Sequence, residues 1–236
     1  MSGWELLGLS AEEWTAVQLS LRVATVATLA SFPFGLAVAY VLARGTHPGL
    51  VILNGVVHLP LVLPPVVTGY LLLLTFGKHG TLGPFLAEHL GLVFSFRWTG
   101  AALASAVMAF PLMVRAMRLS IEAVDRKLEV AAGTLGAPPL AVFVTITLPL
   151  IVPGILAGLI LSFAKSMGEF GATITFVSNI PGETQTLPTA IYTLMQVPDG
   201  ETGAMRLVLV SIGISMAALV VSEWLARRAS GRASLS

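Results

Sequence analysis

The chain has 236 residues, of which 56% are hydrophobic and only 11% are charged, and its formal net charge is +1. A water-soluble core of this size cannot bury so much apolar surface, so we expect an integral membrane protein. The absence of a basic patch argues against nucleic-acid binding, and the absence of cysteine excludes disulfides, thiolate metal sites and cysteine nucleophiles.

Five segments are long and apolar enough to cross a bilayer, which takes about 20 residues for roughly 30 Å of hydrocarbon. We expect spans near residues 17–43, 50–76, 98–117, 143–166 and 205–225. The expected fold class is an all-α integral membrane protein with about five transmembrane helices, in which residues 1–236 form one transmembrane domain. A sixth span over 185–198 is the alternative, although Pro188, Pro198 and the flanking acids make that segment short and polar.

The distribution of charge predicts the orientation, because Lys and Arg gather on the cytoplasmic side of membrane proteins. With five spans, the side that we expect to be cytoplasmic receives Arg44, Arg115, Arg118, Arg126, Lys127, Arg227, Arg228 and Arg232. The opposite side receives mainly acidic residues, namely Glu5, Glu12, Glu13, Glu88, Glu183, Asp199 and Glu201. We therefore expect the N-terminus outside and the C-terminus in the cytoplasm. The acidic N-terminus is unlike that of a cleaved signal peptide, so we expect the first span to remain in the mature protein.

The second span contains a cluster of helix-breaking residues. Pro60, Pro64 and Pro65 remove backbone donors, and Gly69 adds pliability nearby. We expect this helix to bend or open locally within the membrane. It is either a flexible helix that lines a water-filled path or a static kink packed against its neighbours.

The loop 121–140 combines an amphipathic helix with a break. Apolar residues recur there at steps of three and four, which predicts one helical stripe made of Ile121, Val124, Leu128, Ala131, Ala132 and Leu135. Gly136 is placed to end this helix, and Pro138 and Pro139 suit the opening of a second short helix. The pattern indicates either a docking surface for a cytoplasmic partner or a helix lying on the inner leaflet.

The end of the fourth span carries small and ionisable residues, namely Lys165, Gly168, Glu169, Gly171 and Thr173. Ionisable side chains at membrane depth are costly unless paired or hydrated, so we expect Lys165 and Glu169 to face each other or a pore. Residues 169–204 are richer in Thr, Pro, Gly and acids, which predicts an extracytoplasmic loop with short helices that dip toward the membrane. The cluster is either part of an outer gate for a passing oxyanion or a salt bridge that holds the loop.

Several of these segments resemble a known family. Gly136, Ile146, Leu148 and Pro149, preceded by Ala131 and Ala132, resemble the cytoplasmic coupling motif in the permease subunits of ABC importers. Three longer segments resemble the molybdate branch of that family: HLPLVLPPVVTGYLLL at 58–73, FPLMVRAMRLSIEAVD at 110–125 and GEFGATITFVSNIPGETQTLPTAIYTLMQVPDGE at 168–201. The resemblance implies a type I importer permease fold whose coupling helix docks on an ATP-binding subunit through Leu128, Glu129, Ala131, Ala132, Leu135, Gly136 and Ala137.

The chain departs from the family pattern at two positions of this motif. The family's usual Glu directly precedes the two alanines, whereas here Val130 holds that place and Glu129 lies one residue earlier. One residue is about 100° around a helix, which turns Glu129 away from the direction of the family's usual contact. Gly133 stands where many members carry Arg, and it weakens the helix by about 1 kcal/mol relative to Ala.

The resemblance implies the permease subunit of an ATP-driven importer that translocates molybdate across the cytoplasmic (inner) membrane. The chain lacks a G-x-x-x-x-G-K-[ST] loop, so we expect it not to be an enzyme and ATP hydrolysis to occur on a separate subunit. The implied partners are a second copy of the chain, two ATP-binding subunits, an extracytoplasmic molybdate-binding protein and the lipid bilayer. No cofactor, metal or nucleic acid is expected.

Other functions remain open at this point. A tungstate or a sulphate/thiosulphate permease of the same family is the nearest alternative. A secondary carrier would need membrane-buried carboxylates for ion coupling, of which only Glu169 comes near. A non-transporting membrane anchor would need neither the proline cluster nor the amphipathic loop.

Overall fold

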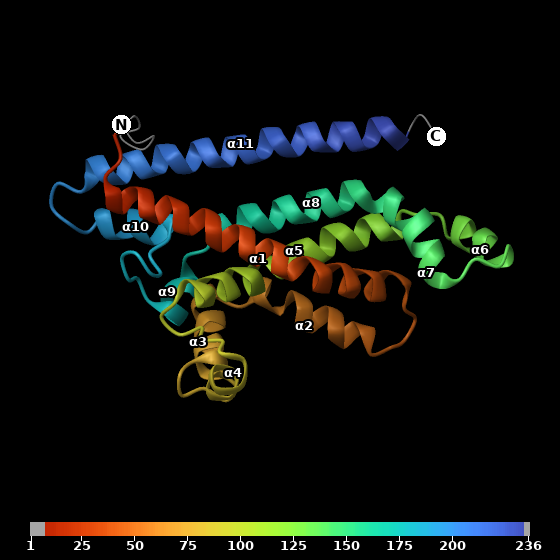
Figure 1. Cartoon of the computed structure of the whole chain (residues 1–236), viewed down its shortest axis with the longest axis horizontal. Helices are drawn as coiled ribbons and strands as arrows, with labels where there is room; N and C mark the ends of the chain where they lie inside the picture. The colour runs from red at the N-terminus through yellow and green to blue at the C-terminus, as the bar shows by residue number, and fades with distance from the viewer. Residues whose placement is uncertain (1–7, 234–236) are drawn as a thin grey trace.

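The computed structural model describes residues 8–233, and in this part of the chain helices and loops make up the whole backbone (Figure 1). The long helices are α1 (Ala11–Arg44), α5 (Trp98–Glu122), α8 (Leu148–Met167) and α11 (Glu201–Ala233). The short ones are α2 (Leu50–Val62), α3 (Pro65–Phe76), α4 (Gly83–Leu90), α6 (Arg126–Thr134), α7 (Pro139–Val142), α9 (Gly171–Val177) and α10 (Leu187–Leu194). A π-helical turn, η2 (Phe143–Thr147), leads into α8. The expected all-α class is confirmed.

The helices that could cross a membrane correspond to the expected spans. Within the described residues, four stretches are long and apolar enough, namely Ala11–Arg44, Trp98–Glu122, Pro139–Met167 and Glu201–Ala218. The pair α2 and α3 passes the same test but is bent by 115°, so it forms a broken span or a re-entrant loop. The alternative sixth span is not formed, because α10 has only 8 residues and is too short to cross.

The break in the 50–76 segment lies at Leu63 and Pro64. The N–H of Leu63 donates to the carbonyl of Leu59 at 3.0 Å and closes α2. Pro65 opens α3, where its missing N–H would have had no intrahelical partner. Pro60 lies inside α2 and does not end it. The expected bend is therefore confirmed, and it is sharp enough to divide the segment into two helices.

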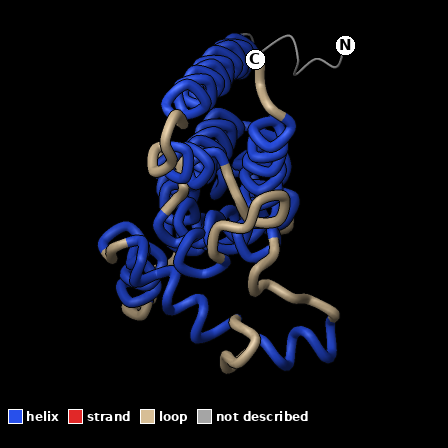
Figure 2. The backbone as a smooth tube through the Cα atoms, turned by 90° about the vertical axis from the view of Figure 1, so that its left-hand side faces the viewer, coloured by secondary structure: helices blue, strands red, loops and turns tan. Residues whose placement is uncertain are grey.

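Helices α1, α5 and α8 run side by side through the middle of the molecule, and Figure 2 shows the bundle nearly end-on. Small residues bring α8 close to α5: a Cβ at Gly158 would lie 3.1 Å from the carbonyl oxygen of Met113, and one at Gly154 would overlap Ser120. Close approach through small residues is a common way to pack helices in membranes. At one end, Arg206 of α11 pairs with Glu13 of α1 at 2.7 Å.

The bundle has two different ends (Figure 1). One, which we call the α6 end, contains α6, α7, the end of α1 and the start of α2. The other, the α10 end, contains α3, α4, α9, α10 and the starts of α1 and α11. Basic residues such as Arg44 and Arg126 thus lie at the α6 end, and acidic residues such as Glu13 and Glu201 lie at the α10 end. Glu5 and the side chains of Arg227, Arg228 and Arg232 lie outside the described residues.

The single helical stripe expected over 121–135 is wrong. Helix α5 continues to Glu122, the chain breaks at 123–125, and α6 begins at Arg126. Ile121 and Val124 therefore belong to the core, with 0% and 7% of their surface exposed. The break is three residues long, which is nearly one helical turn. The apolar residues before and after it therefore keep the spacing of a single helix in the sequence.

The segment 169–204 contains short helices, as expected. These are α9 and α10, and Phe176 and Val177 at the end of α9 are fully buried. Leu187 at the start of α10 is 1% exposed, and its N–H donates to the hydroxyl of Ser20 in α1 at 2.6 Å. Much of this segment is thus packed against the long helices.

Candidate functional site

Helices α6 and α7 extend from the body at the α6 end (Figure 1). Asp125 caps α6, because its side chain accepts a hydrogen bond from the N–H of Lys127 at 2.9 Å. Gly136 follows the C-cap with φ +88°, a left-handed conformation that favours glycine, and Pro139 then opens α7. The break expected at Gly136, Pro138 and Pro139 is confirmed.

None of the residues of α6 or α7 is buried, and both helices have exposed apolar side chains. The exposed fractions of four side chains, which we call the coupling surface, are Leu128 49%, Val130 64%, Leu135 88% and Leu140 74%. Among the other residues expected to dock, Ala131 and Gly136 are exposed, and Ala132 and Ala137 are half-buried. An apolar surface on an extension of the body indicates contact with another molecule.

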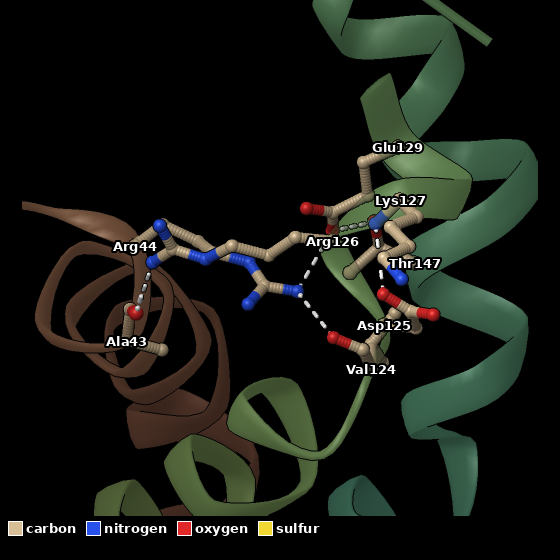
Figure 3. Close-up of polar contacts among 8 residues, drawn as sticks. All are labelled: Ala43, Arg44, Val124, Asp125, Arg126, Lys127, Glu129 and Thr147. Carbon is tan, nitrogen blue, oxygen red and sulfur yellow. Dashed lines mark hydrogen bonds and ion pairs between the residues drawn. The ribbon is translucent and has the colours of Figure 1, made fainter. Parts of the chain in front are cut away.

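Three polar residues fix the base of α6 to the bundle (Figure 3). The Nη2 of Arg44, the last residue of α1, donates to Glu129 Oε1 at 3.0 Å and to the carbonyl of Val124 at 3.3 Å. The hydroxyl of Thr147 donates to the same Glu129 oxygen at 2.7 Å. The side chains of Arg44 and Glu129 are only 12% and 17% exposed. We call Arg44, Glu129 and Thr147 the clasp.

The residues singled out at the end of α8, which we call the gate cluster, are Lys165, Gly168, Glu169, Gly171 and Thr173. Lys165 Nζ donates to Glu169 Oε2 at 2.7 Å, so the expected pairing is present. The other oxygen of Glu169 accepts from the N–H of Ala172 at 3.0 Å, which holds the first turn of α9. Glu169 is only 2% exposed. This carboxylate therefore joins the end of α8 to the start of α9.

The gate cluster touches the broken span directly. A Cβ at Gly171 would lie 2.8 Å from the Cβ of Pro65, and a Cβ at Gly69 would lie 2.5 Å from the carbonyl oxygen of Ala172. The two glycines thus allow α3 and α9 to pack backbone against backbone. Thr173 is fully buried in α9, and its hydroxyl has no hydrogen-bond partner.

The remaining residues of the two predicted groups lie apart from this contact. Pro60 sits inside α2, Pro64 is exposed at the elbow between α2 and α3, and Gly168 is exposed directly after α8. The structure therefore brings Pro65, Gly69, Lys165, Glu169, Gly171 and Thr173 together.

Sequence patterns did not reveal the clasp. Arg44 was a charge that marked orientation, and Thr147 was one of two threonines in an apolar run. Glu129 is 85 residues from Arg44 and 18 from Thr147, so no helical period connects them. A polar side chain inside the apolar segment FVTITLP, just after a charged helix, was the available signal.

Solved structures show the class of the fold. The chain superposes on a bacterial ABC transporter involved in the import of the acidic polysaccharide alginate with a TM-score of 0.72, over 95% of this chain and 82% of that one, at 20% identity. On the MetNI methionine ABC transporter in inward-facing conformations the TM-score is 0.70, over 97% and 99% of the two chains, at 17% identity. The fold is that of a type I ABC importer permease.

Sequence similarity shows the family. Residues 23–231 match the family described as binding-protein-dependent transport system inner membrane component, and the chain belongs to this family of multi-pass inner membrane proteins. It is 59% identical over 225 residues to the molybdenum transport system permease protein ModB of Escherichia coli strain K12, covering 95% of this chain and 98% of that one. Identity to ModB of Haemophilus influenzae is 56% over 216 residues, 92% and 94% of the two chains. Identity to the sulfate transport system permease protein CysW of Synechococcus elongatus is 36% over 216 residues, 90% and 74% of the two chains.

Proposed function

We propose that this chain is the transmembrane permease subunit of an ATP-driven importer that carries molybdate across the cytoplasmic membrane. The observation that carries the proposal is the coupling surface, an exposed apolar surface on a short helix pair at the basic end of a membrane bundle. The relatives named for molybdenum transport match nearly the whole chain and are more similar to it than the sulfate relative. This difference favours molybdate over sulphate or thiosulphate, and tungstate stays an alternative because its anion has nearly the same size and charge.

An ATP-binding subunit is the partner that suits the coupling surface. The chain itself has no phosphate-binding loop of the G-x-x-x-x-G-K-[ST] type, so another polypeptide must supply the energy. Leu135 and Leu140 stand beside the turn at Gly136 and would enter a cleft on that subunit. Two such subunits would serve a homodimer, with one coupling surface each.

The homodimer would form through the broken span. Helices α2 and α3 expose large apolar side chains, with exposed fractions of 77% for Val51, 72% for Ile52, 80% for Val62 and 54% for Tyr70. The elbow between these helices frees backbone carbonyls, which are tolerated at membrane depth where they line a watered path. We place the path for the anion between the α2–α3 segments of the two copies.

The gate cluster would control the extracytoplasmic end of this path, where a molybdate-binding protein delivers the anion. The close packing of α9 on α3 supports this role, because a shift of one must move the other. Thr173 is buried in the present state, so its hydroxyl would meet the anion only after α9 moves. The alternative, that Lys165 and Glu169 only brace the segment, predicts no effect of the pair on coupling.

The docking role is tested with Leu135→Asp and with Leu90→Asp as the matched control. Both leucines are exposed, at 88% and 61%, but Leu90 ends α4 at the opposite end of the molecule. We expect Leu135→Asp to abolish copurification of the ATP-binding subunit and Leu90→Asp to leave it unchanged. Retention of the subunit by the Leu135 variant would rule out this surface.

The transport role is tested in proteoliposomes with labelled molybdate. We expect uptake only when the binding protein, the ATP-binding subunit and ATP are all present, and we expect excess tungstate to compete more strongly than excess sulphate. Uptake without the ATP-binding subunit would indicate a secondary carrier, and no uptake under any condition would indicate a membrane anchor. Equal competition by sulphate would indicate a broader oxyanion permease.

A further inference from the structure

The clasp lies within the permease, beside the coupling surface and not on it. We propose that Glu129 is a positioning residue: through Arg44 and Thr147 it sets the angle at which α6 leaves the bundle and passes the movement of α6 to α1 and α8. This inference rests on the proposed function and adds a transmission step to it.

The first support is that α6 is attached to the bundle by polar contacts near its start and not by buried apolar side chains. It is nine residues long, too short to be stable alone, and none of its residues is buried. Its apolar side chains Leu128 and Val130 are exposed, with 49% and 64% of their surface accessible. Polar contacts at its base must therefore fix its direction.

The second support is the way in which the clasp joins separate segments (Figure 3). Glu129 lies in α6, Arg44 ends α1, and Thr147 ends η2, so one carboxylate oxygen connects three elements. A second contact joins the same two helices, because the side chain of Arg126 in α6 donates to the carbonyl of Ala43 in α1 at 3.3 Å. A partly buried carboxylate that loses its cation is costly, so these elements are held in one arrangement.

The third support is the position of η2. The N–H of Leu148 donates to the carbonyl of Phe143, the five-residue spacing of a π-helix, and such single turns are frequent at functional sites. The ring of Phe143 also packs edge-on against Tyr40 of α1, with 5.2 Å between ring centroids. A push on α6 would thus reach η2 through Thr147 and act on both α1 and α8.

Helix α8 provides the rest of the route. It has 20 residues, so it is about 30 Å long, and it runs from η2 to Met167, with Lys165 in its last turn and Glu169 two residues beyond its end. The clasp and the gate cluster therefore lie at opposite ends of one helix. Helix α8 can therefore carry a movement of α6 at the coupling surface to the gate cluster, and no direct contact between the two ends is needed.

The experiment uses three variants, Glu129→Gln, Arg44→Gln and Thr147→Val, each in the reconstituted complex. The matched controls are Glu122→Gln, which removes a carboxylate whose Arg118 partner is 2.8 Å away at the end of α5, and Thr145→Val, which removes a hydroxyl that donates to the carbonyl of Ala141, four residues earlier. Uptake per ATP hydrolysed, copurification of the ATP-binding subunit and the mobility of a nitroxide at Thr134→Cys, at the end of α6 and outside the coupling surface, are measured. The parent chain has no cysteine, so each copy of the chain carries one label when it is labelled before assembly with the other subunits.

We expect the clasp variants to keep the ATP-binding subunit, to lower uptake per ATP about tenfold and to increase nitroxide mobility, as loss of a charged hydrogen bond would. The controls should resemble the parent. Glu129→Gln and Arg44→Gln should also be non-additive, because each alone removes the same pair.

Two results would overturn the inference. Loss of the ATP-binding subunit from Glu129→Gln would mean that Glu129 contacts that subunit directly. Normal uptake per ATP in all three clasp variants would mean that the clasp is only structural. Failure of the proposed function is a separate outcome, since it appears as retention of the ATP-binding subunit by Leu135→Asp.

Discussion

Two glutamates show how the same side chain acquires different roles from its surroundings. Glu129 is 17% exposed and holds an Arg from another helix and a Thr hydroxyl. Glu169 is nearly inaccessible and holds a Lys one helical turn away and a backbone N–H. The first joins elements far apart in the chain, and the second joins neighbours. We expect substitutions at Glu129 to change motion and those at Glu169 to change local stability as well.

Removing Lys165 should destabilise the protein more than neutralising Glu169. Lys165→Met leaves the buried carboxylate without a cation, and we expect a loss of about 2 kcal/mol, moderated because the Lys side chain is 31% exposed. Glu169→Gln should lose about 1 kcal/mol, since the amide oxygen still accepts from Ala172. Thermal unfolding in detergent measures both, with Lys78→Met as the control, and the reverse order would contradict the prediction.

The Glu169→Gln variant also tests the gate. If the gate cluster controls the path, Glu169→Gln should let ATP hydrolysis continue while molybdate uptake falls. Uptake and hydrolysis are measured together in proteoliposomes. Coupling equal to that of the parent would leave only the salt bridge that holds α9.

The glycines of the gate cluster should differ in their tolerance of alanine. Gly171→Ala would press a methyl group against Pro65, at 2.8 Å, and should cost about 1 to 3 kcal/mol. Gly168→Ala is the matched control, because its nearest neighbours would be 3.9 Å away. We expect a lower unfolding temperature and reduced uptake only for Gly171→Ala. Equal effects would show that α3 and α9 are not closely packed.

At the scale of the element, α6 is a short helix whose termini are well specified and whose interior is weak. Asp125 and Gly136 define its beginning and end, and Gly133 lowers its helix propensity. Such a helix can respond to a partner without disturbing the bundle. The clasp then decides where this weak helix points.

Substitutions at its two glycines should therefore have opposite effects. Gly133→Ala meets no atom within 4 Å and should stabilise α6 by about 1 kcal/mol. Gly136→Ala forces a Cβ into a left-handed conformation, at φ +88°, and should cost about 1 kcal/mol. Hydrogen exchange of the α6 amides measures both, and we expect protection to rise about fivefold in the first and to fall in the second. Unchanged protection in both variants would mean that α6 does not open independently.

At the scale of the whole molecule, charge separates along the bundle. Basic residues such as Arg44 and Arg126 lie at the α6 end, and acidic residues such as Glu13 and Glu201 lie at the α10 end. The α6 end is predicted to face the cytoplasm because basic residues gather there. Every functional step proposed above depends on this orientation.

Single cysteines in the cysteine-free chain test the orientation. Glu183→Cys, in the exposed loop before α10, should react with a membrane-impermeant thiol reagent on intact cells. Leu135→Cys, 88% exposed on the coupling surface, should react only after permeabilisation. The unsubstituted chain is the control. Labelling of Leu135→Cys on intact cells would place the coupling surface outside and end the proposal.

Much of the architecture could be read from the sequence because it depends on local properties. The five apolar segments, the bend at Pro64 and Pro65, the helix end at Gly136 and the pairing of Lys165 with Glu169 all follow from residue type and short spacing. Membrane spans impose strong local rules, since each must satisfy its own backbone hydrogen bonds in lipid.

The tertiary structure decided the contacts between residues that are distant in the chain. The break at 123–125 was hidden because it preserves the apolar period, and it places Ile121 and Val124 in the core. The packing of Gly69 on Ala172 and of Gly171 on Pro65 depends on how α3 turns at the elbow. The clasp of Arg44, Glu129 and Thr147 exists only because three helix ends meet at one place. Local propensity specifies each helix end, but only packing of the bundle brings such ends within hydrogen-bonding distance.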